Sequence, residues 1–434
     1  MRKITFLCAL AFLSATAGAE TVALSLDEAL RGASENNSAL KSARITLGVS
    51  ETEAASAWNA FLPSLSVSGR LSSSHALPNS EATVDAAKAT TLSVSAGASL
   101  TVQGGVGEAL RQKALAKAAA RVSYEKAEAD LAVQVKKAYY GLVTQERSVA
   151  VSEKNLAIAR EQEKRVGENY RSGLSSELDY LTAQYTRASL EQDLLNLRQS
   201  RANARKSFNI LLGLSMDTEL SLTDSVPEDI PEIAKPESIG GFVERRYDVI
   251  AAYYALEIAK SQRLASTINR YGPTLSVSES VSAQANPPKD LEAPKTGTLT
   301  VSVSVPLDGY VPGSAASVAA KKAAGAVEKA TLALEDARRA ALREIETLFD
   351  SADQLRETVR LARFNERIAL RKFELSGQGY ESGLVTQGSL DEARQNYLSA
   401  QLKVLSARNA LETGIIDLAN ALNVEETALY AKEN

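Results

Sequence analysis

The sequence repeats itself at an offset of 210 residues. The stretch "YRSGL" at 170–174 returns as "YESGL" at 380–384, and "PSLSVS" at 63–68 returns as "PTLSVS" at 273–278. Matches that share one offset indicate a tandem duplication. Whatever one copy folds into, we expect the other copy to repeat.

The duplication predicts two domains and a linker. A third match, "LLGL" at 211–214 against "ALNV" at 421–424, has the same offset of 210 residues. Pro227, Pro231 and Pro236 cluster after the first copy, and proline cannot continue a helix. We expect a first repeat over 20–225, a proline-rich linker over 226–237 and a second repeat over 238–434.

Each copy contains a proline-free stretch far longer than an ordinary globular helix, at 106–171 and at 314–381. Apolar residues within each stretch step by threes, fours and sevens, which is heptad spacing. At about 1.5 Å per residue, such a helix is on the order of 100 Å long. Gly173 and Gly383 then follow, and glycine can close a helix in the left-handed conformation. Because a second heptad pattern follows each turn, we expect antiparallel helical hairpins over about 106–214 and 314–424.

Each copy also predicts one earlier helix and two β-strands. The helices, about 26–61 and 239–271, should stop before Pro63 and Pro273. Leucine and valine then alternate with serine and threonine, which is typical of strands with one apolar face. The expected strands lie at about 64–74, 91–102, 273–283 and 298–307.

These strands fit a membrane barrel, with apolar side chains toward lipid and hydroxyl groups toward a wet lumen. A soluble sandwich would use the same alternation with its apolar face inward. Four strands cannot close a membrane barrel, for which eight is the usual minimum, and open edges in lipid are costly. Two chains would give eight strands with a filled interior, whereas three would give twelve, wide enough for a channel. The geometry therefore favours three chains.

Composition and the first residues predict export from the cytoplasm. Arg2 and Lys3 precede a short apolar run, and a small-residue site ends at Ala19, so we expect a signal peptide over 1–19. The single cysteine, Cys8, lies inside it, which excludes disulfides and thiolate chemistry from the mature chain. Without Arg2 and Lys3 the chain has 47 basic and 53 acidic residues, a net charge of −6, which argues against nucleic-acid binding.

Several short motifs accompany these elements: "LSLDEAL" to "SALKSAR" at 24–44, "LPSLSVS" at 62–68, "PLDGY" at 306–310 and the two "Y-x-S-G-L" turns. With these motifs, the order of the elements, present twice, resembles the TolC-like outer-membrane efflux proteins of bacteria with two membranes. The resemblance implies a mainly α fold with a β-barrel part, in which a homotrimer shares one twelve-stranded barrel in the outer-membrane lipid. A coiled-coil tunnel of α-helices would continue it through the periplasm. It also implies a passive exit duct, fed by an inner-membrane transporter through a periplasmic adaptor, with no catalysis, cofactor or metal.

The resemblance places the closed periplasmic tip at the two turns, where acidic side chains narrow the entrance. Glu392 matches a position where aspartate is typical, whereas Ser389 stands where the family often has a second acid. A ring of carboxylates in a narrow wet pore attracts cations. Alternatively, Asp179, Asp391 and Glu392 are first-turn acids favoured by the helix dipole. The implied tip gate is Glu392, Ser389 and Asp179, and the implied adaptor-docking turns are Gly173, Leu174, Gly383 and Leu384.

Other candidate residues have ordinary interpretations. His75 is the single histidine, and one histidine per chain is a poor metal site unless three meet on a symmetry axis. It also lacks the partners of a catalytic set. Four aromatic residues stand where helices meet strands, either as an interfacial belt or as junction core. They are Trp58, Phe61, Tyr271 and Tyr310. The alternative function is a secreted coiled-coil scaffold or adaptor with a soluble β domain.

Overall fold

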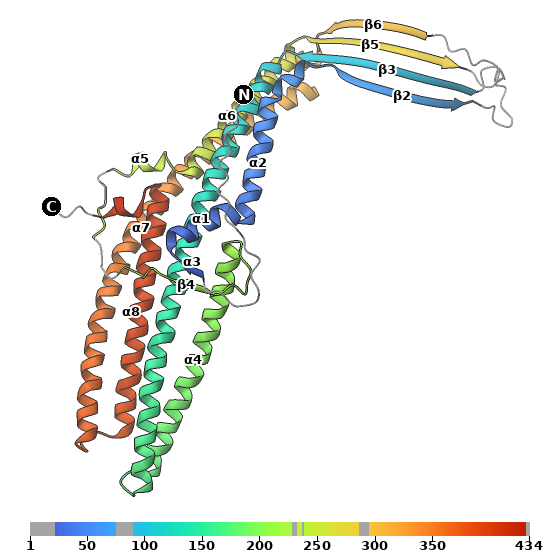
Figure 1. The fold of residues 1–434 in the computed structure, drawn as a ribbon. Helices are drawn as coiled ribbons and strands as arrows, with labels where there is room; N and C mark the ends of the chain where they lie inside the picture. The colour runs from blue at the N-terminus through green and yellow to red at the C-terminus, as the bar shows by residue number, and fades with distance from the viewer. Residues whose placement is uncertain (1–21, 75–89, 228–231, 237, 286–294, 431–434) are drawn as a thin grey trace, which may run out of the picture. The chain divides into compact units, whose positions relative to one another are not determined.

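The computed structural model describes residues 22–74, 90–227, 232–236, 238–285 and 295–430 (Figure 1). The expected signal peptide over 1–19, with Cys8, and His75 lie outside the described residues. The chain is mainly helical, as predicted, and divides into two compact units. One unit comprises residues up to 42, 127–239 and residues from 343, and the other comprises 43–126 and 240–342.

Four long helices dominate the chain. They are α3 (Val106–Arg171), α4 (Glu177–Leu211), α7 (Ala315–Glu381) and α8 (Gln387–Leu422). The helices α3 and α7, with 66 and 67 residues, contribute to both units. Among the described residues, no helix is both long enough and apolar enough to cross a membrane.

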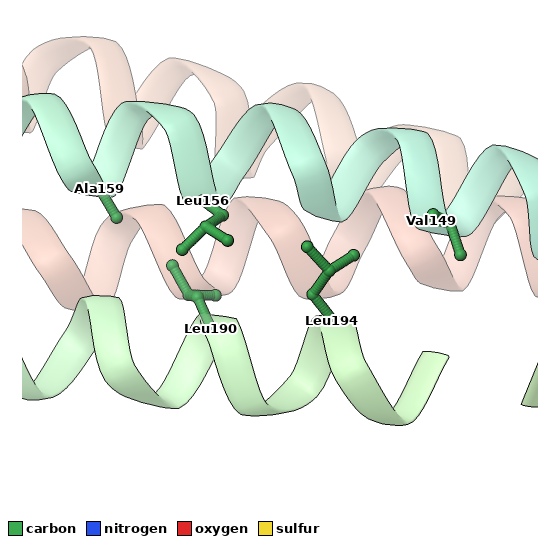
Figure 2. Packing of buried hydrophobic residues seen from close by; sticks show 5 residues of the cluster. All are labelled: Val149, Leu156, Ala159, Leu190 and Leu194. Atoms are coloured by element: carbon green, nitrogen blue, oxygen red, sulfur yellow. The ribbon is translucent and has the colours of Figure 1, made fainter. Parts of the chain in front are cut away.

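The core of the first unit follows the heptad positions. Val149, Leu156 and Ala159 of α3 are buried against Leu190 and Leu194 of α4 (Figure 2). The side chain of Leu398, from α8, packs against the same cluster. The second hairpin buries its own seam on α7, where Ile345, Phe349, Ala352, Val359 and Ala362 are at most 4% exposed.

The N-terminal helix is not continuous from 26 to 61, as the sequence suggested. It consists of α1 (Leu26–Asn36), α2 (Ser38–Ala55) and a short 3₁₀ turn η1 (Ala57–Phe61). The break lies at Asn37, whose side chain accepts hydrogen bonds from the backbone N–H groups of Ala39 and Leu40 and donates to the carbonyl of Leu211. Asparagine competes with helical hydrogen bonding in this way, so it starts a new helix here. At the first helix, Ser25 forms a capping box with Glu28.

A parallel ribbon that the sequence did not reveal closes the first unit. Strand β1 (Val22–Leu24) pairs with β4 (Leu220–Leu222), each only three residues long. The fully buried Tyr139 of α3 donates its hydroxyl to the carbonyl of Leu24 and accepts from the backbone N–H of Asp224. This strap links the start of the described chain to the segment after α4.

The second unit contains an antiparallel sheet with the strand order β2-β3-β5-β6. Its register places mainly serine and threonine on one face and mainly apolar residues on the other face, where Glu279 stands opposite Ala98 and Leu299. The sheet is open, with β2 and β6 at its edges. The bounds are β2 (Ser64–Ser73), β3 (Thr90–Gln103), β5 (Thr274–Ala285) and β6 (Lys295–Ser304), followed by η2 (Asp308–Tyr310). The helices α5 (Gly240–Val243) and α6 (Tyr247–Tyr271) precede β5.

A buried carboxylate in the first unit should make its stability pH-dependent. Burial raises the pKa of Glu412 in α8 to about 7; nearby Glu426, in the C-terminal 3₁₀ turn η3 (Glu426–Leu429), adds to the rise, and Lys136 opposes it. Because the folded pKa exceeds the unfolded value, the folded state binds more protons between the two, and stability falls as pH rises through that window. We expect Glu412→Gln to raise the stability of the folded state at pH 8, on the order of 2 kcal/mol, and to change little at pH 5.

The measurement is the midpoint of thermal unfolding at both pH values. The exposed Glu425, just before η3, offers a matched control as Glu425→Gln. An equal gain for Glu412→Gln at pH 5 and pH 8 would contradict the assignment.

Candidate functional site at the tips of the helical hairpins

The two hairpin turns have the same backbone geometry. Gly173 and Gly383 adopt positive φ angles of 75° and 74°, as the sequence predicted. In the first turn, the backbone N–H of Leu174 donates to the carbonyl of Asn169 at 2.8 Å. In the second turn, Leu384 donates to Gly379 at 2.8 Å. These bonds close each long helix with a Schellman motif, which requires a left-handed residue.

Each turn exposes one large apolar side chain. Leu174 is 79% exposed and Leu384 is 84% exposed, among the highest values of any large apolar residue described. A leucine held at the apex of a rigid turn presents a small apolar knob to whatever meets the tip. Such knobs are suited to a partner with apolar grooves between its helices.

The first-turn residues cap the helices that follow. Ser176 and Asp179 form a capping box, in which the Ser176 hydroxyl donates to the Asp179 carboxylate at 2.6 Å. In the second copy, Thr386 caps α8 by accepting from the backbone N–H of Ser389. Asp179 and Ser389 therefore occupy equivalent capping positions, 210 residues apart. Two of the three residues of the expected gate, Asp179 and Ser389, therefore have this structural task as well.

A cleft of about 760 Å³ lies between the two hairpins near their turns. Arg165, Asp179 and Tyr380 contribute charged and polar groups to its wall. Burial raises the pKa of the Tyr380 hydroxyl, Asp179 adds to the rise, and a hydrogen bond with Ser175 opposes it. The wall also includes apolar side chains from both hairpins, among them Ile158, Val166, Leu174, Phe373, Leu384 and Leu390.

A chain of buried polar side chains joins the hairpins beside this cleft. The Gln162 amide of α3 donates to the Gln387 carbonyl at 3.0 Å, and the Gln387 amide donates to Asp391 at 3.0 Å. The Arg394 Nη2 atom lies 3.0 Å from the second Asp391 oxygen, and both side chains are nearly inaccessible. This contact lacks hydrogen-bond alignment, so Nε and Nη2 of Arg394 have no acceptor. Burial lowers the pKa of Arg394, and Asp391 opposes that effect.

Sequence reasoning missed this polar chain, apart from Asp391, which it took for a first-turn acid. Its positions on α8, Gln387, Asp391 and Arg394, are spaced by four and three residues and are all buried. Polar residues at the spacing of an apolar seam were the available signal. The neighbouring Glu392 is exposed and does not line the cleft, whereas Asp179 does.

The four aromatic residues singled out from the sequence lie in the other unit. Tyr271 and Tyr310 are brought together, with ring centroids 5.0 Å apart. Trp58 and Phe61 belong to η1 and are 60% and 47% exposed. Among the described residues, no group of three or more histidine, cysteine or acidic side chains is arranged to hold a metal ion.

Comparison with known proteins identifies a family and a shared fold. A family model described as outer membrane efflux protein matches residues 29–214 and 242–424. The outer membrane protein VceC of Vibrio cholerae is 17% identical, with a TM-score of 0.72, and the match covers 92% of this chain and 96% of VceC. A comparison with curated protein sequences gives no match.

Two outer membrane channels have the same fold. The CmeC channel of Campylobacter jejuni is 16% identical with a TM-score of 0.75, over 94% of this chain and 87% of CmeC. The open state of the MtrE channel of Neisseria gonorrhoeae is 19% identical with a TM-score of 0.70, over 92% of this chain and 89% of MtrE. At these identities the likeness is one of fold.

Proposed function

The chain belongs to the outer membrane efflux protein family, and we propose that it forms a passive exit duct of a tripartite export system. In this proposal an inner-membrane transporter and a periplasmic adaptor deliver small molecules or secreted polypeptides to a homotrimer in the outer membrane. The helical hairpins form a periplasmic tunnel, and their turns form its gate. The alternative of a secreted scaffold has no support in the comparisons.

The observation that carries the proposal is a second, exposed heptad seam on two helices. On α4, Leu178, Leu181, Tyr185 and Leu195 are between 51% and 74% exposed. On α7, Leu361, Phe364, Ile368 and Leu375 are between 43% and 51% exposed. Figure 1 shows α3, α4, α7 and α8 running together in this unit. On α4 and α7 the exposed residues form apolar seams, which suit coiled-coil contact with another copy of the chain.

The duplication indicates how separate copies of the chain would pack against one another. Within the chain, α3 contacts α8 through Gln162 and Gln387. The repeat equivalents of these two residues, at the offset of 210, are Lys372 on α7 and Glu177 on α4. Both are exposed and opposite in charge. We therefore expect α7 of one copy to pack on α4 of the next copy as α3 packs on α8.

Contacts of this head-to-tail kind close into rings. A ring of three copies would contain twelve helices and would bring the edge strands β2 and β6 of neighbouring copies together. Three sheets of four strands would make a twelve-stranded barrel, which removes the open edges. The exposed apolar face of the sheet would then face lipid, and its serine and threonine face would line the lumen.

A conductance measurement tests both the duct and its gate. We expect the purified protein to produce conductance steps in planar lipid bilayers, and multivalent cations added on the tip side to block them. Because Glu392 is exposed just beyond the turn, three copies would place three carboxylates in one ring, which attracts cations. Glu392→Ala should weaken the block by about tenfold or more.

Glu381, exposed at the end of α7, provides the control as Glu381→Ala, because it removes one carboxylate per copy on the other side of the turn. Protein that inserts without conductance steps would overturn the duct proposal. Conductance with an unchanged block in Glu392→Ala would remove only Glu392 from the gate.

A further inference from the structure

An arginine is fixed where α6 meets the sheet. Arg270 is the penultimate residue of α6, and its Nε atom donates to the carbonyl of Gly309 at 2.6 Å. Its guanidinium carbon lies 4.8 Å from the centroid of the Tyr271 ring, and that ring contacts Tyr310. A backbone acceptor and an aromatic face thus hold the guanidinium in one orientation, and the opposite edge of the group is not used by these contacts.

The packing of this arginine requires glycine in the turn η2. A Cβ atom at Gly309 would lie 2.3 Å from the carbonyl oxygen of Arg270 and 2.8 Å from its Cγ atom. No other residue type fits that space without moving the helix end. The motif "PLDGY" therefore has a local task, which is to seat Arg270.

In the part of the chain that the structure describes, Arg270 has no acidic partner. Among the described residues it forms no ion pair with a carboxylate, whereas Arg111 in the same unit pairs with Glu257 at 3.2 Å. The pair Tyr271–Tyr310 and the carbonyl of Gly309 supply no full negative charge. A rigid, partly exposed guanidinium without a carboxylate is suited to an external anion, and its planar fork matches phosphate.

The surroundings change in a fixed order along this end of the sheet. The register pairs Thr274 of β5 with Ser304 of β6 at the ends of both strands. On the strand side of this pair, one face of the sheet exposes Leu275, Val301 and Val303, with Glu279 further along it. On the other side of the pair, the side chain of Leu307 is 73% exposed. Going back along the chain from Thr274, Tyr271 comes first, in contact with Tyr310, which is 64% exposed, and Arg270 comes next, with its guanidinium over the Tyr271 ring. An apolar band, then aromatic residues and then a cation is the order expected along a membrane protein from the hydrocarbon core to the lipid headgroups.

From this order and from the uncompensated charge we propose that Arg270 binds the phosphate of a glycerophospholipid headgroup in the inner leaflet of the outer membrane. The proposal rests on the proposed function only in that the sheet must stand in a membrane. The Tyr310 ring would lie against the glycerol region, and the free edge of the guanidinium would bind two phosphate oxygens.

The site occurs once per copy of the chain. The residue equivalent to Arg270 in the first repeat, 210 positions earlier, is Ala60, and the equivalent of Tyr271 is Phe61. The first junction therefore has the aromatic belt without the cation. A trimer would hold three headgroup sites, alternating around the barrel with three junctions that lack them.

Binding is tested with short-chain probes on the full chain purified in a non-ionic, phosphate-free detergent. Dihexanoylphosphatidylglycerol supplies the headgroup, dihexanoylglycerol supplies the same chains without phosphate, and inorganic phosphate supplies the free anion. We expect the first probe to raise the midpoint of thermal unfolding in a saturable way and the other two to have no effect at equal concentration. Arg270→Gln should weaken the apparent affinity for the phospholipid about tenfold, and Arg270→Lys should weaken it less.

Arg263→Gln is the matched control, because Arg263 is an exposed arginine of the same helix. It should bind the phospholipid as the unaltered chain does. Equal affinity in Arg270→Gln, or an equal loss in Arg263→Gln, would overturn the proposal, and so would an equal shift with inorganic phosphate. Conductance in bilayers tests the proposed function separately. If the protein conducts but the phospholipid has no effect on unfolding, only the headgroup-site proposal is overturned.

Discussion

A chain carrying Leu178→Glu and Leu181→Glu is expected to stay monomeric and to lose all conductance. Both side chains belong to the exposed seam of α4, where they are 73% and 51% exposed. In the proposed ring this seam packs on α7 of the next copy. Burying a leucine contributes about 1.5–3 kcal/mol, and burying an unpaired carboxylate costs more. Because every contact of a closed ring contains the same two changes, the penalty is paid three times in one trimer.

The measurement is the molar mass in detergent solution, by size exclusion with light scattering, followed by bilayer conductance. Asn196→Glu combined with Ser200→Glu is the matched control, since both residues are exposed on α4 and lie off the seam. The control should remain a trimer. A trimer of unchanged mass in the Leu178→Glu, Leu181→Glu chain would exclude this seam from the contact between copies.

The register of the contact can be checked with a charge exchange. Glu177 and Lys372 are expected to face each other between copies, because their repeat equivalents Gln387 and Gln162 are hydrogen-bonded within the chain. Glu177→Lys should weaken the trimer through repulsion, and adding Lys372→Glu should restore it. Restoration by the second change would tie the two residues to one contact, as a double-mutant cycle does.

The sequence was informative where a pattern decides structure locally. Heptad spacing and the lack of proline predicted the long helices, and Gly173 and Gly383 predicted the left-handed turns. Asn37 shows the limit, since it caps α2 locally but also donates to a distant acceptor, the carbonyl of Leu211, that no local pattern reveals. The strap at Tyr139 could not be predicted for the same reason, because its partners Leu24 and Asp224 are over 80 residues away in the sequence.

In the candidate site, too, local patterns predict some features and tertiary contacts decide the others. Asp391 and Glu392 are adjacent acids in the second turn of α8, not in its first turn as the sequence suggested, and helix-dipole reasoning treats them alike. The structure buries Asp391 against the other hairpin and exposes Glu392. A rotation of about 100° per residue separates the two side chains, so the face that packs decides their roles. Which face packs follows from tertiary contact between two copies of the repeat, which a single pattern does not contain.

The buried pair formed by Asp391 and Arg394 should respond strongly to removal of one partner. Asp391→Ala leaves the guanidinium of Arg394, 2% exposed, without any compensating charge. Breaking a buried ion pair in this way costs about 3–5 kcal/mol, and here Gln387 also loses its acceptor. We expect local opening of α8 near the tip to become at least about a hundredfold more frequent, which amide hydrogen exchange of residues 387–398 reports.

Replacing both partners should be less harmful than replacing one. A chain with Asp391→Leu and Arg394→Leu removes the two charges together and fills the space with apolar side chains, which is often neutral or stabilising. The rate of amide hydrogen exchange near the tip of this variant should stay within about tenfold of the rate in the unaltered chain. Gln162→Leu breaks only the bond across to α3, so it should loosen the contact between hairpins without exposing a charge. If Asp391→Ala exchanged no faster than the double variant, the pair would carry no net cost when broken, and its place beside the cleft would then rest on packing alone.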